Sequence, residues 1–330
     1  EVGALEVEHQ VHPAVQGLLR DLVDAVAGAA AVLTQNVPIA TSVVDTVRRH
    51  PSLLAQTALT IDHLSGGRFI LGLGSGETEN TVPYGVDVNK PVSRFEEALR
   101  VIRMVWESEG PVDCTGQFFE LRHARLDTEL CGGRCPPIWI GASGPRMLDI
   151  TGRYADGWWP AGAWSPEDYA AKLGVIHASA ERAGRDPEAI VPAFIMTCLI
   201  GDEDELHEIL KAPLVKAILL QISAAELAKL GHAHPMGDGW RGYQDIDPGE
   251  LTRERILDFL DKVEPQAVLD MVPHGTPKEV ARIVKGYCDA GLRVPKILDY
   301  GGMAGLAYGA HSPDNVRAAE DELLRLTTGG

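Results

Sequence analysis

The stretch Leu64-Ser-Gly-Gly-Arg-Phe-Ile-Leu-Gly-Leu-Gly-Ser-Gly-Glu-Thr-Glu-Asn80 decides the fold class of this 330-residue chain. It joins a helix end, marked by two glycines, to a short apolar strand, Phe69 to Leu73. The strand runs into Gly74-Ser-Gly76, where backbone N–H groups are open to a flat ligand or a phosphate. Glu77 follows directly. A glycine turn and an acid at the end of a buried strand are typical of an active site.

Strand-like and helix-like segments alternate along the whole chain. Strand patterns occupy residues 2–7, 37–44, 69–73, 137–142, 157–160, 190–200 and 294–300, and helical patterns occupy residues 13–27, 50–63, 92–106, 145–154, 166–183, 276–290 and 313–326. Repeated strand–helix units require a parallel sheet covered by helices. We therefore predict an α/β protein with a single (β/α)8 TIM-barrel domain over residues 1–330, with excursions at about 111–135 and 211–275.

The composition argues against several classes of protein. A net charge of −17 disfavours nucleic acid and anionic membranes as partners. No apolar run approaches the ~20 residues of a membrane span. Five cysteines at irregular spacing do not make a disulfide framework in a chain of this size. The expectation is a soluble cytoplasmic protein.

Glu77 is the candidate catalytic residue, with Asn80, Gly74 and Gly76 as candidate cofactor contacts beside it. A carboxylate at the carboxyl end of a barrel strand can act as an acid, a base or a partner of a ring. In the alternative, Thr78 and Asn80 only open the next segment as helix caps.

A second candidate site lies at residues 141–144, between a buried strand and a helix. Backbone N–H groups at a helix N-terminus bind phosphate well, and a nearby arginine adds positive charge. The predicted phosphate contacts are Gly141, Ala142, Ser143, Gly144 and Arg146. The alternative is a tight turn with no ligand. Gly275-Thr276 shows the same pattern more weakly.

Three tryptophans lie in or just after the strand pattern at residues 157–160: Trp158, Trp159 and Trp164. These indoles either line an apolar substrate pocket or plug the rim of the barrel. Cys131 and Cys135 lack the spacing and the partners of a metal site, so no metal is predicted.

Five motifs occur in a characteristic order: Ala40-Thr-Ser-Val-Val-Asp45 with Arg48-Arg-His-Pro51, Leu64–Arg68 with Gly72–Glu77, Pro137-Ile-Trp-Ile-Gly-Ala-Ser-Gly144, Tyr154-Ala-Asp-Gly-Trp158 and Gly275-Thr-Pro-Lys-Glu-Val280. Together they resemble the bacterial luciferase-like oxidoreductases, which are (β/α)8 barrels. The resemblance covers residues 37–160 and 274–300 well and the two excursions poorly.

Within that family, Ser42-Val43 and Glu77 to Asn80 are more similar to the coenzyme F420 (deazaflavin) enzymes than to the FMN monooxygenases. The resemblance implies a non-prolyl cis peptide bond between Ser42 and Val43 that backs the cofactor ring. An ordinary β-branched core strand is the alternative. The opening segment, Leu5 to Pro13, is similar to a ketoreductase branch associated with long-chain lipid ketones.

The resemblance also implies a second barrel strand soon after the first helix, ending in a catalytic side chain. Residues 25–33 lead directly into Thr34-Gln-Asn-Val37, which leaves no room for that strand. We therefore expect a βα segment to be absent near residues 27–33, either omitted from the numbering or deleted from the chain. Asp62-His63 does not replace it, because it lies at the end of a helix.

These observations favour a coenzyme F420-dependent oxidoreductase that transfers a hydride between the deazaflavin and a carbonyl or alcohol group. A small-molecule or lipid-like substrate is the expected partner. One alternative is an FMN-dependent monooxygenase on the same fold. Another is a catalytically inactive barrel that binds a ligand or partner. The apolar faces leave a homodimer open.

Overall fold

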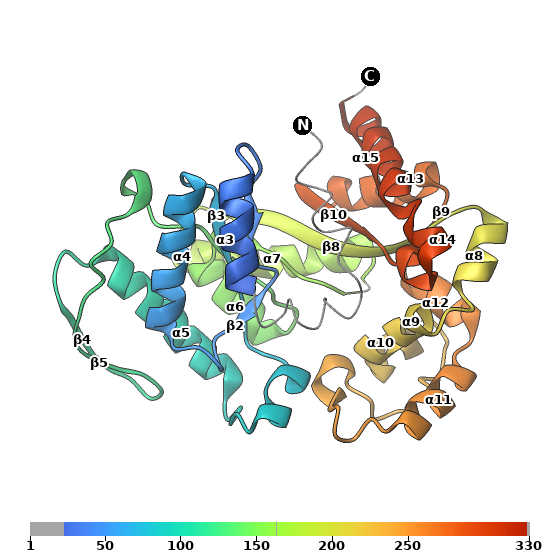
Figure 1. Cartoon of the computed structure of the whole chain (residues 1–330), viewed down its shortest axis with the longest axis horizontal. Coiled ribbons are helices and arrows are strands. Elements are labelled where there is room, and N and C mark those ends of the chain that lie inside the picture. Colours follow the sequence, from blue (N-terminus) through green and yellow to red (C-terminus); the bar gives the residue numbers. More distant parts are fainter. Residues whose placement is uncertain (1–22, 163, 329–330) are drawn as a thin grey trace. The chain divides into compact units, whose positions relative to one another are not determined.

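The computed structural model describes residues 23–162 and 164–328, which form two compact units (Figure 1). The first contains the described residues up to Gly76 together with residues 86–159 and 176–190. The second contains residues 77–85, 160–175 and the described residues from 191 onward. The strand expected at residues 2–7 lies outside the described residues, as does the first part of the helix expected at 13–27.

The first unit is built on a parallel sheet whose strands run in the order β1-β3-β6-β7, with β2 pairing further along β3. Its strands are β1 (Ile39–Ala40), β2 (Val44–Asp45), β3 (Phe69–Gly74), β6 (Ile138–Ile140) and β7 (Gly157–Trp158). Its helices are α3 (Val23–Leu33), α4 (Pro51–Ser65), α5 (Pro91–Glu107), α6 (Pro145–Tyr154) and the second half of α7 (Pro166–Arg182), with short 3-10 turns η3 (Cys131–Gly133) and η4 (Pro187–Ala189). The predicted parallel sheet covered by helices is confirmed.

The strand expected at residues 37–44 is interrupted. Ladder pairing with β3 holds at β1 and resumes at β2, but residues 41–43 leave the ladder. There the Thr41 hydroxyl accepts from the Gly72 N–H at 2.8 Å and donates to the Gly72 carbonyl at 2.9 Å. A side chain thus takes over the hydrogen bonds that a backbone ladder would otherwise make, which periodicity alone does not reveal.

No strand lies between α3 and β1 in the described part of the chain. Residues 27–33 belong to α3, and the Thr34 N–H donates to the Ala30 carbonyl one turn earlier. The chain then reaches Ile39 without a break. The residues present therefore carry α3 directly into β1, as expected from the short connection.

The excursion at 111–135 contains an antiparallel hairpin, β4 (Val112–Thr115) and β5 (Glu120–Ala124), which sequence analysis missed. Its turn is held by Glu97 of α5, whose buried carboxylate accepts from the backbone N–H groups of residues 117, 118 and 119 at 2.8–3.0 Å. Burial alone raises the pKa of Glu97, but these three donors outweigh it and hold the pKa below its usual value.

The second unit contains three parallel strands, with β8 paired to β10 along most of its length and to β9 at its carboxyl end. Its strands are β8 (Val191–Ile200), β9 (His274–Gly275) and β10 (Val294–Asp299). Its α-helices are the first half of α7, α8 (Glu203–Ile209), α9 (Pro213–Lys216), α10 (Ala224–Lys229), α11 (Arg253–Lys262), α12 (Pro265–Met271), α13 (Pro277–Asp289), α14 (Leu306–Gly309) and α15 (Ser312–Thr328). Its 3-10 turns are η1 (Thr78–Asn80), η2 (Val82–Tyr84), η5 (Ala217–Gln221), η6 (Gly242–Asp245) and η7 (Tyr300–Ala304).

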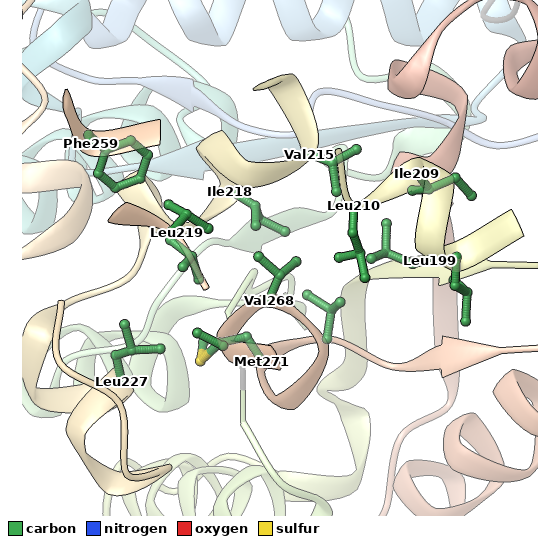
Figure 2. Close-up of a cluster of buried hydrophobic side chains, with 14 residues drawn as sticks. Leu199, Ile209, Leu210, Val215, Ile218, Leu219, Leu227, Phe259, Val268 and Met271 are labelled. Atoms are coloured by element: carbon green, nitrogen blue, oxygen red, sulfur yellow. The ribbon is translucent and has the colours of Figure 1, made fainter. Parts of the chain in front are cut away.

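The excursion at 211–275 is a packed helical layer with a buried hydrophobic core. Figure 2 shows its core, where Ile218, Leu219 and Phe259 meet Val268 and Met271. Even the stretch at 231–239 takes part, because His234 is only 5% exposed. Its ring stacks on Trp240 and bonds the Leu219 carbonyl at 2.8 Å, contacts that its short polar neighbours do not predict.

Candidate functional site

The peptide bond between Ser42 and Val43 is cis, which confirms the implication of the resemblance. Both residues lie at the carboxyl edge of the first unit's parallel sheet, between β1 and β2, and both are exposed. The Val43 side chain retains 38% of its accessible surface, although its neighbours Val44 to Val47 are buried. An apolar side chain is thus displayed where parallel sheets usually bind ligands.

Three glycines from neighbouring strands make room for Val43. A Cβ atom on Gly74 would lie 2.8 Å from Val43 Cγ2, and one on Gly141 would lie 3.3 Å from the same atom. At Gly72 a Cβ would lie 1.8 Å from the Thr41 carbonyl oxygen. Glycine is therefore required at 72 and 74, because any side chain would displace the segment that carries Val43.

The indole of Trp159 closes one side of this surface. Its Nε1 donates to Ser42 Oγ at 2.9 Å, and its ring packs on Trp139 with centroids 4.9 Å apart and planes tilted by 43°. Trp159 is half-buried and therefore remains open to a ligand.

Trp158, by contrast, is fully buried, and its Nε1 donates to the Ala142 carbonyl at 2.9 Å. Its indole fills the core of the first unit, which matches the packing alternative rather than a pocket-lining role. Adjacent strand residues point to opposite faces, so two consecutive indoles take different environments.

The turn at residues 141–144 keeps the features that suggested an anion site. Gly144 is the N-cap of α6 with no side-chain cap, and Ser143, Gly144 and Arg146 are exposed. Arg146 lies 3.5 Å from Glu96, a long ion pair that leaves its guanidinium largely in solvent. Ala142 is buried, so only its backbone can contribute. The phosphate role of this turn stays a prediction.

The remaining predicted residues of the glycine turn fall on either side of the boundary between units. Gly76 ends the first unit's segment with a positive φ of 92°, which favours glycine. In the second unit, the exposed Glu77 is the N-cap of η1, and its carboxylate accepts from the Asn80 amide at 3.1 Å. The Thr78 hydroxyl donates to the Gln244 carbonyl in η6 at 2.8 Å.

Trp164 belongs to an aromatic cluster of the second unit. It stacks on Phe194 with centroids 5.5 Å apart, and Lys172 Nζ lies 4.6 Å from the centre of its ring. The Tyr287 hydroxyl donates to its carbonyl oxygen. The ring is half-buried, so it keeps an exposed part.

Several other polar residues of the quoted motifs have structural partners. Arg48 pairs with Asp45 at 2.8 Å and Arg49 with Asp24 at 3.0 Å. The Thr276 N–H, considered for a phosphate, donates to Glu279 in a capping box. Within residues 23–162 and 164–328, no group of three or more His, Cys, Asp and Glu residues could hold a metal ion.

A family model described as luciferase-like monooxygenase matches residues 12–293. The chain belongs to the luciferase-like monooxygenase family. This luciferase-like chain is 41% identical over 253 residues to the phthiodiolone/phenolphthiodiolone dimycocerosates ketoreductase of Mycobacterium bovis, a match that spans 76% of the chain and 66% of that relative. It is 38% identical over 138 residues to a Mycobacterium tuberculosis protein, 38% of the chain and 40% of the relative. That protein carries the provisional name coenzyme F420-dependent oxidoreductase Rv3520c.

Solved structures share the fold of this luciferase-like chain. An F420-dependent secondary alcohol dehydrogenase in complex with an F420–acetone adduct superposes with a TM-score of 0.68 at 23% identity, over 90% of this chain and 83% of that one. The coenzyme F420-dependent tetrahydromethanopterin reductase of Methanopyrus kandleri gives 0.67 at 22% identity, over 91% and 85%. The predicted fold class is thereby confirmed.

None of the helices within residues 23–162 and 164–328 has the length and hydropathy of a membrane span.

Sequence analysis missed two residues that build the Val43 surface. Thr41 is 3% exposed and bonds both backbone groups of Gly72. Trp139 is 8% exposed and supports Trp159. A signal for the second was present, because an indole in the middle of an Ile-Trp-Ile strand must face away from its two isoleucine neighbours.

Proposed function

We propose that this chain is a coenzyme F420-dependent oxidoreductase that interconverts a carbonyl group and an alcohol on an apolar substrate. The observation that carries the proposal is the exposed Val43 side chain, seated over glycines 72, 74 and 141 at the carboxyl edge of a parallel sheet. Such an apolar surface, bare of competing side chains, fits one face of a flat ring system.

The residues present fit the proposed cofactor. Gly74 and Gly141 keep the approach to Val43 free of side chains, and the indole of Trp159 donates a hydrogen bond to the neighbouring Ser42. When bound, the deazaflavin supplies the ring atom that donates or accepts the hydride. The role of Val43 would be to orient that ring and to exclude water from its face.

Two further roles belong to the same proposal. The exposed turn of Ser143 and Gly144, with Arg146, would hold a phosphate at the N-terminus of α6. Glu77, whose carboxylate is held by the Asn80 amide, would give or take the proton that balances hydride transfer at a carbonyl oxygen.

The relatives support the choice of chemistry. The 41% identical relative is named as a ketoreductase, and reduction of a ketone is the chemistry proposed here. Its name also contains a lipid class, which agrees with an apolar substrate. The chain spans 66% of that relative, so the relative's own substrate is not assigned to this chain.

The proposal is tested by titrating the purified full chain with coenzyme F420 and separately with FMN, following the fluorescence of each cofactor. We expect saturable F420 binding and weaker FMN binding. Reduction of simple aliphatic ketones by the reduced coenzyme then tests the reaction. Tight FMN binding without F420 binding would favour the monooxygenase alternative, and binding of neither would favour an inactive barrel.

A matched pair of variants locates the site. Val43→Asp places a charge on the proposed ring surface and should weaken F420 binding by more than about tenfold, since an unpaired carboxylate would be desolvated. Val37→Asp is the control, because Val37 is similarly exposed (42%) but precedes β1. Equal effects of the two variants would contradict the site.

A further inference from the structure

Trp159 and Ser42 connect two segments that lie far apart in the sequence and at opposite sides of the first unit's sheet. Ser42 lies between β1 and β2, which pair with β3. Trp159 follows β7, which pairs with β6, and β6 in turn pairs with β3. The 2.9 Å hydrogen bond from Trp159 Nε1 to Ser42 Oγ therefore reaches across the carboxyl ends of β3 and β6.

The strands beneath this bond end in glycine, which allows the indole to cross them. A Cβ on Gly74 or Gly141 would meet the Val43 side chain at 2.8 or 3.3 Å. On Gly141 it would also lie 3.5 Å from the Trp159 carbonyl oxygen. Gly74 and Gly141, which leave Val43 exposed, therefore also leave space for Trp159, which donates a hydrogen bond to Ser42.

Trp159 is itself fixed before it meets Ser42. Its N–H donates to the Ile140 carbonyl at 2.9 Å, and its ring rests on Trp139. Trp139 has no room to move toward β7, because even a Cβ on Gly157 would lie 2.5 Å from its ring. The indole N–H is therefore presented in one direction by packed neighbours.

Ser42, in contrast, is exposed, and its side chain would rotate freely without a partner. A hydrogen bond from a fixed donor selects one orientation of Ser42 and so restrains the adjoining Val43. Preorganising a ligand-binding surface in this way improves affinity by removing an ordering cost at binding.

We propose that Trp159 is a positioning residue for the cofactor ring, acting through its hydrogen bond to Ser42 to hold the Val43 surface in its binding orientation. The proposal rests on the proposed function, because the flat ligand is the deazaflavin. It differs from a pocket-lining role, in which the indole ring would act by direct contact and its N–H would not matter.

The test uses the full chain and three variants: Trp159→Phe, which keeps an aromatic ring without the N–H, Ser42→Ala, which removes the acceptor, and the double variant. Each single variant should weaken F420 binding by about 3- to 10-fold, the effect of one neutral hydrogen bond. The double variant should bind no more weakly than the weaker single variant, because both changes remove the same bond. A fourth variant, Ser42→Thr, keeps the hydroxyl and should bind F420 as tightly as the parent chain.

Trp106→Phe is the matched control. It also removes an indole hydrogen bond of the first unit, from Trp106 Nε1 to the Ala55 carbonyl at 3.0 Å, but this bond lies between helices α5 and α4. This control should lower the urea midpoint and leave F420 affinity within about twofold of the parent.

The outcomes separate the two proposals. Absence of F420 binding to the parent chain would overturn the proposed function. Normal binding by the parent and by both single variants would overturn only the role of Trp159. Additive losses in the double variant would also overturn it, because they would show that the indole and the hydroxyl act independently.

Discussion

Replacement of Thr41 by valine probes the interaction that lifts residues 41–43 out of the strand ladder. Threonine and valine have nearly the same shape, so the change keeps the packing of this 3% exposed side chain. It removes the hydroxyl that accepts from the Gly72 N–H at 2.8 Å and donates to the Gly72 carbonyl at 2.9 Å. Both backbone groups of buried Gly72 would then lose this partner.

The expected loss of stability follows from those two groups. A buried polar group left without a partner costs about 1–3 kcal/mol, so Thr41→Val should lower the free energy of unfolding by about 2–4 kcal/mol. Thr41→Ser removes only a buried methyl group and should cost about 1 kcal/mol. The variant that keeps the shape should therefore be the less stable of the two.

Urea unfolding followed by tryptophan fluorescence measures this difference. Trp106, Trp139, Trp158 and Trp159 all lie in the first unit, so they report on its unfolding. At a denaturant slope of about 3 kcal/mol per M, Thr41→Val should lower the midpoint by about 1 M. If Thr41→Ser proved less stable than Thr41→Val, packing of the methyl group would outweigh the hydrogen bonds and the reasoning would be refuted.

Three further changes test other parts of the structure. Burial lowers the pKa of His234, so the contribution of His234 to stability is present above the unfolded pKa of ~6.5 and is lost as the pH falls. His234→Phe should therefore lower the free energy of unfolding by about 2–3 kcal/mol at pH 8 and by less at pH 5, measured by urea unfolding at both pH values. Arg68→Met removes five hydrogen bonds, three of them to backbone carbonyls at and just after the end of α3 and one to the carbonyl of Ser65 at the end of α4. It should lower the free energy of unfolding by about 2–4 kcal/mol and speed hydrogen exchange at the end of α3, and unchanged exchange would contradict that role. Glu97→Gln places an amide against three backbone N–H donors, and limited proteolysis should cut the β4–β5 turn faster than in the parent.

Much of the fold was predictable because its elements carry strong local signals. The helix at Pro145–Tyr154 matches its prediction at both ends, and β3 and β8 match theirs within one residue. The failures occurred where long-range contacts decide. The β4–β5 hairpin depends on a carboxylate from another helix, and the helical layer around Phe259 depends on a core assembled from distant segments.

The candidate site was predictable to the extent that it consists of backbone. Gly74, Gly141 and the Ser42-Val43 bond lie in motifs on which the resemblance to the family rests, and the cis bond was implied by that resemblance. Side chains were harder, because an indole at residue 158 and one at 159 look alike in sequence. Only the strand register separates them, sending the first into the core and the second toward Ser42.

The motifs themselves divide according to the end of the strand on which their residues lie. Arg68 and Asp156 precede β3 and β7, and both serve the structure: Asp156 accepts from Arg103 at 2.6 Å and from the Ile138 N–H at 2.8 Å. Gly74 and Trp159 come at the carboxyl ends of the same two strands and shape the candidate site. In a parallel sheet this division is expected, since ligands bind at the carboxyl edge.

The distinction between the two ends of the strands also helps to identify the residue that supplies the proton for ketone reduction. Asp45 lies at the carboxyl edge, two residues beyond Val43, but it is 8% exposed. Its oxygens accept from the backbone N–H groups of Val47 and Arg48 and from Arg48 Nε. Because its side chain is buried and both of its oxygens take part in these bonds, Asp45 is not open to a substrate. The exposed Glu77, which follows β3 in the chain, is therefore the residue we propose for proton transfer; Glu77→Gln should lower the rate of ketone reduction while F420 affinity stays close to that of the parent.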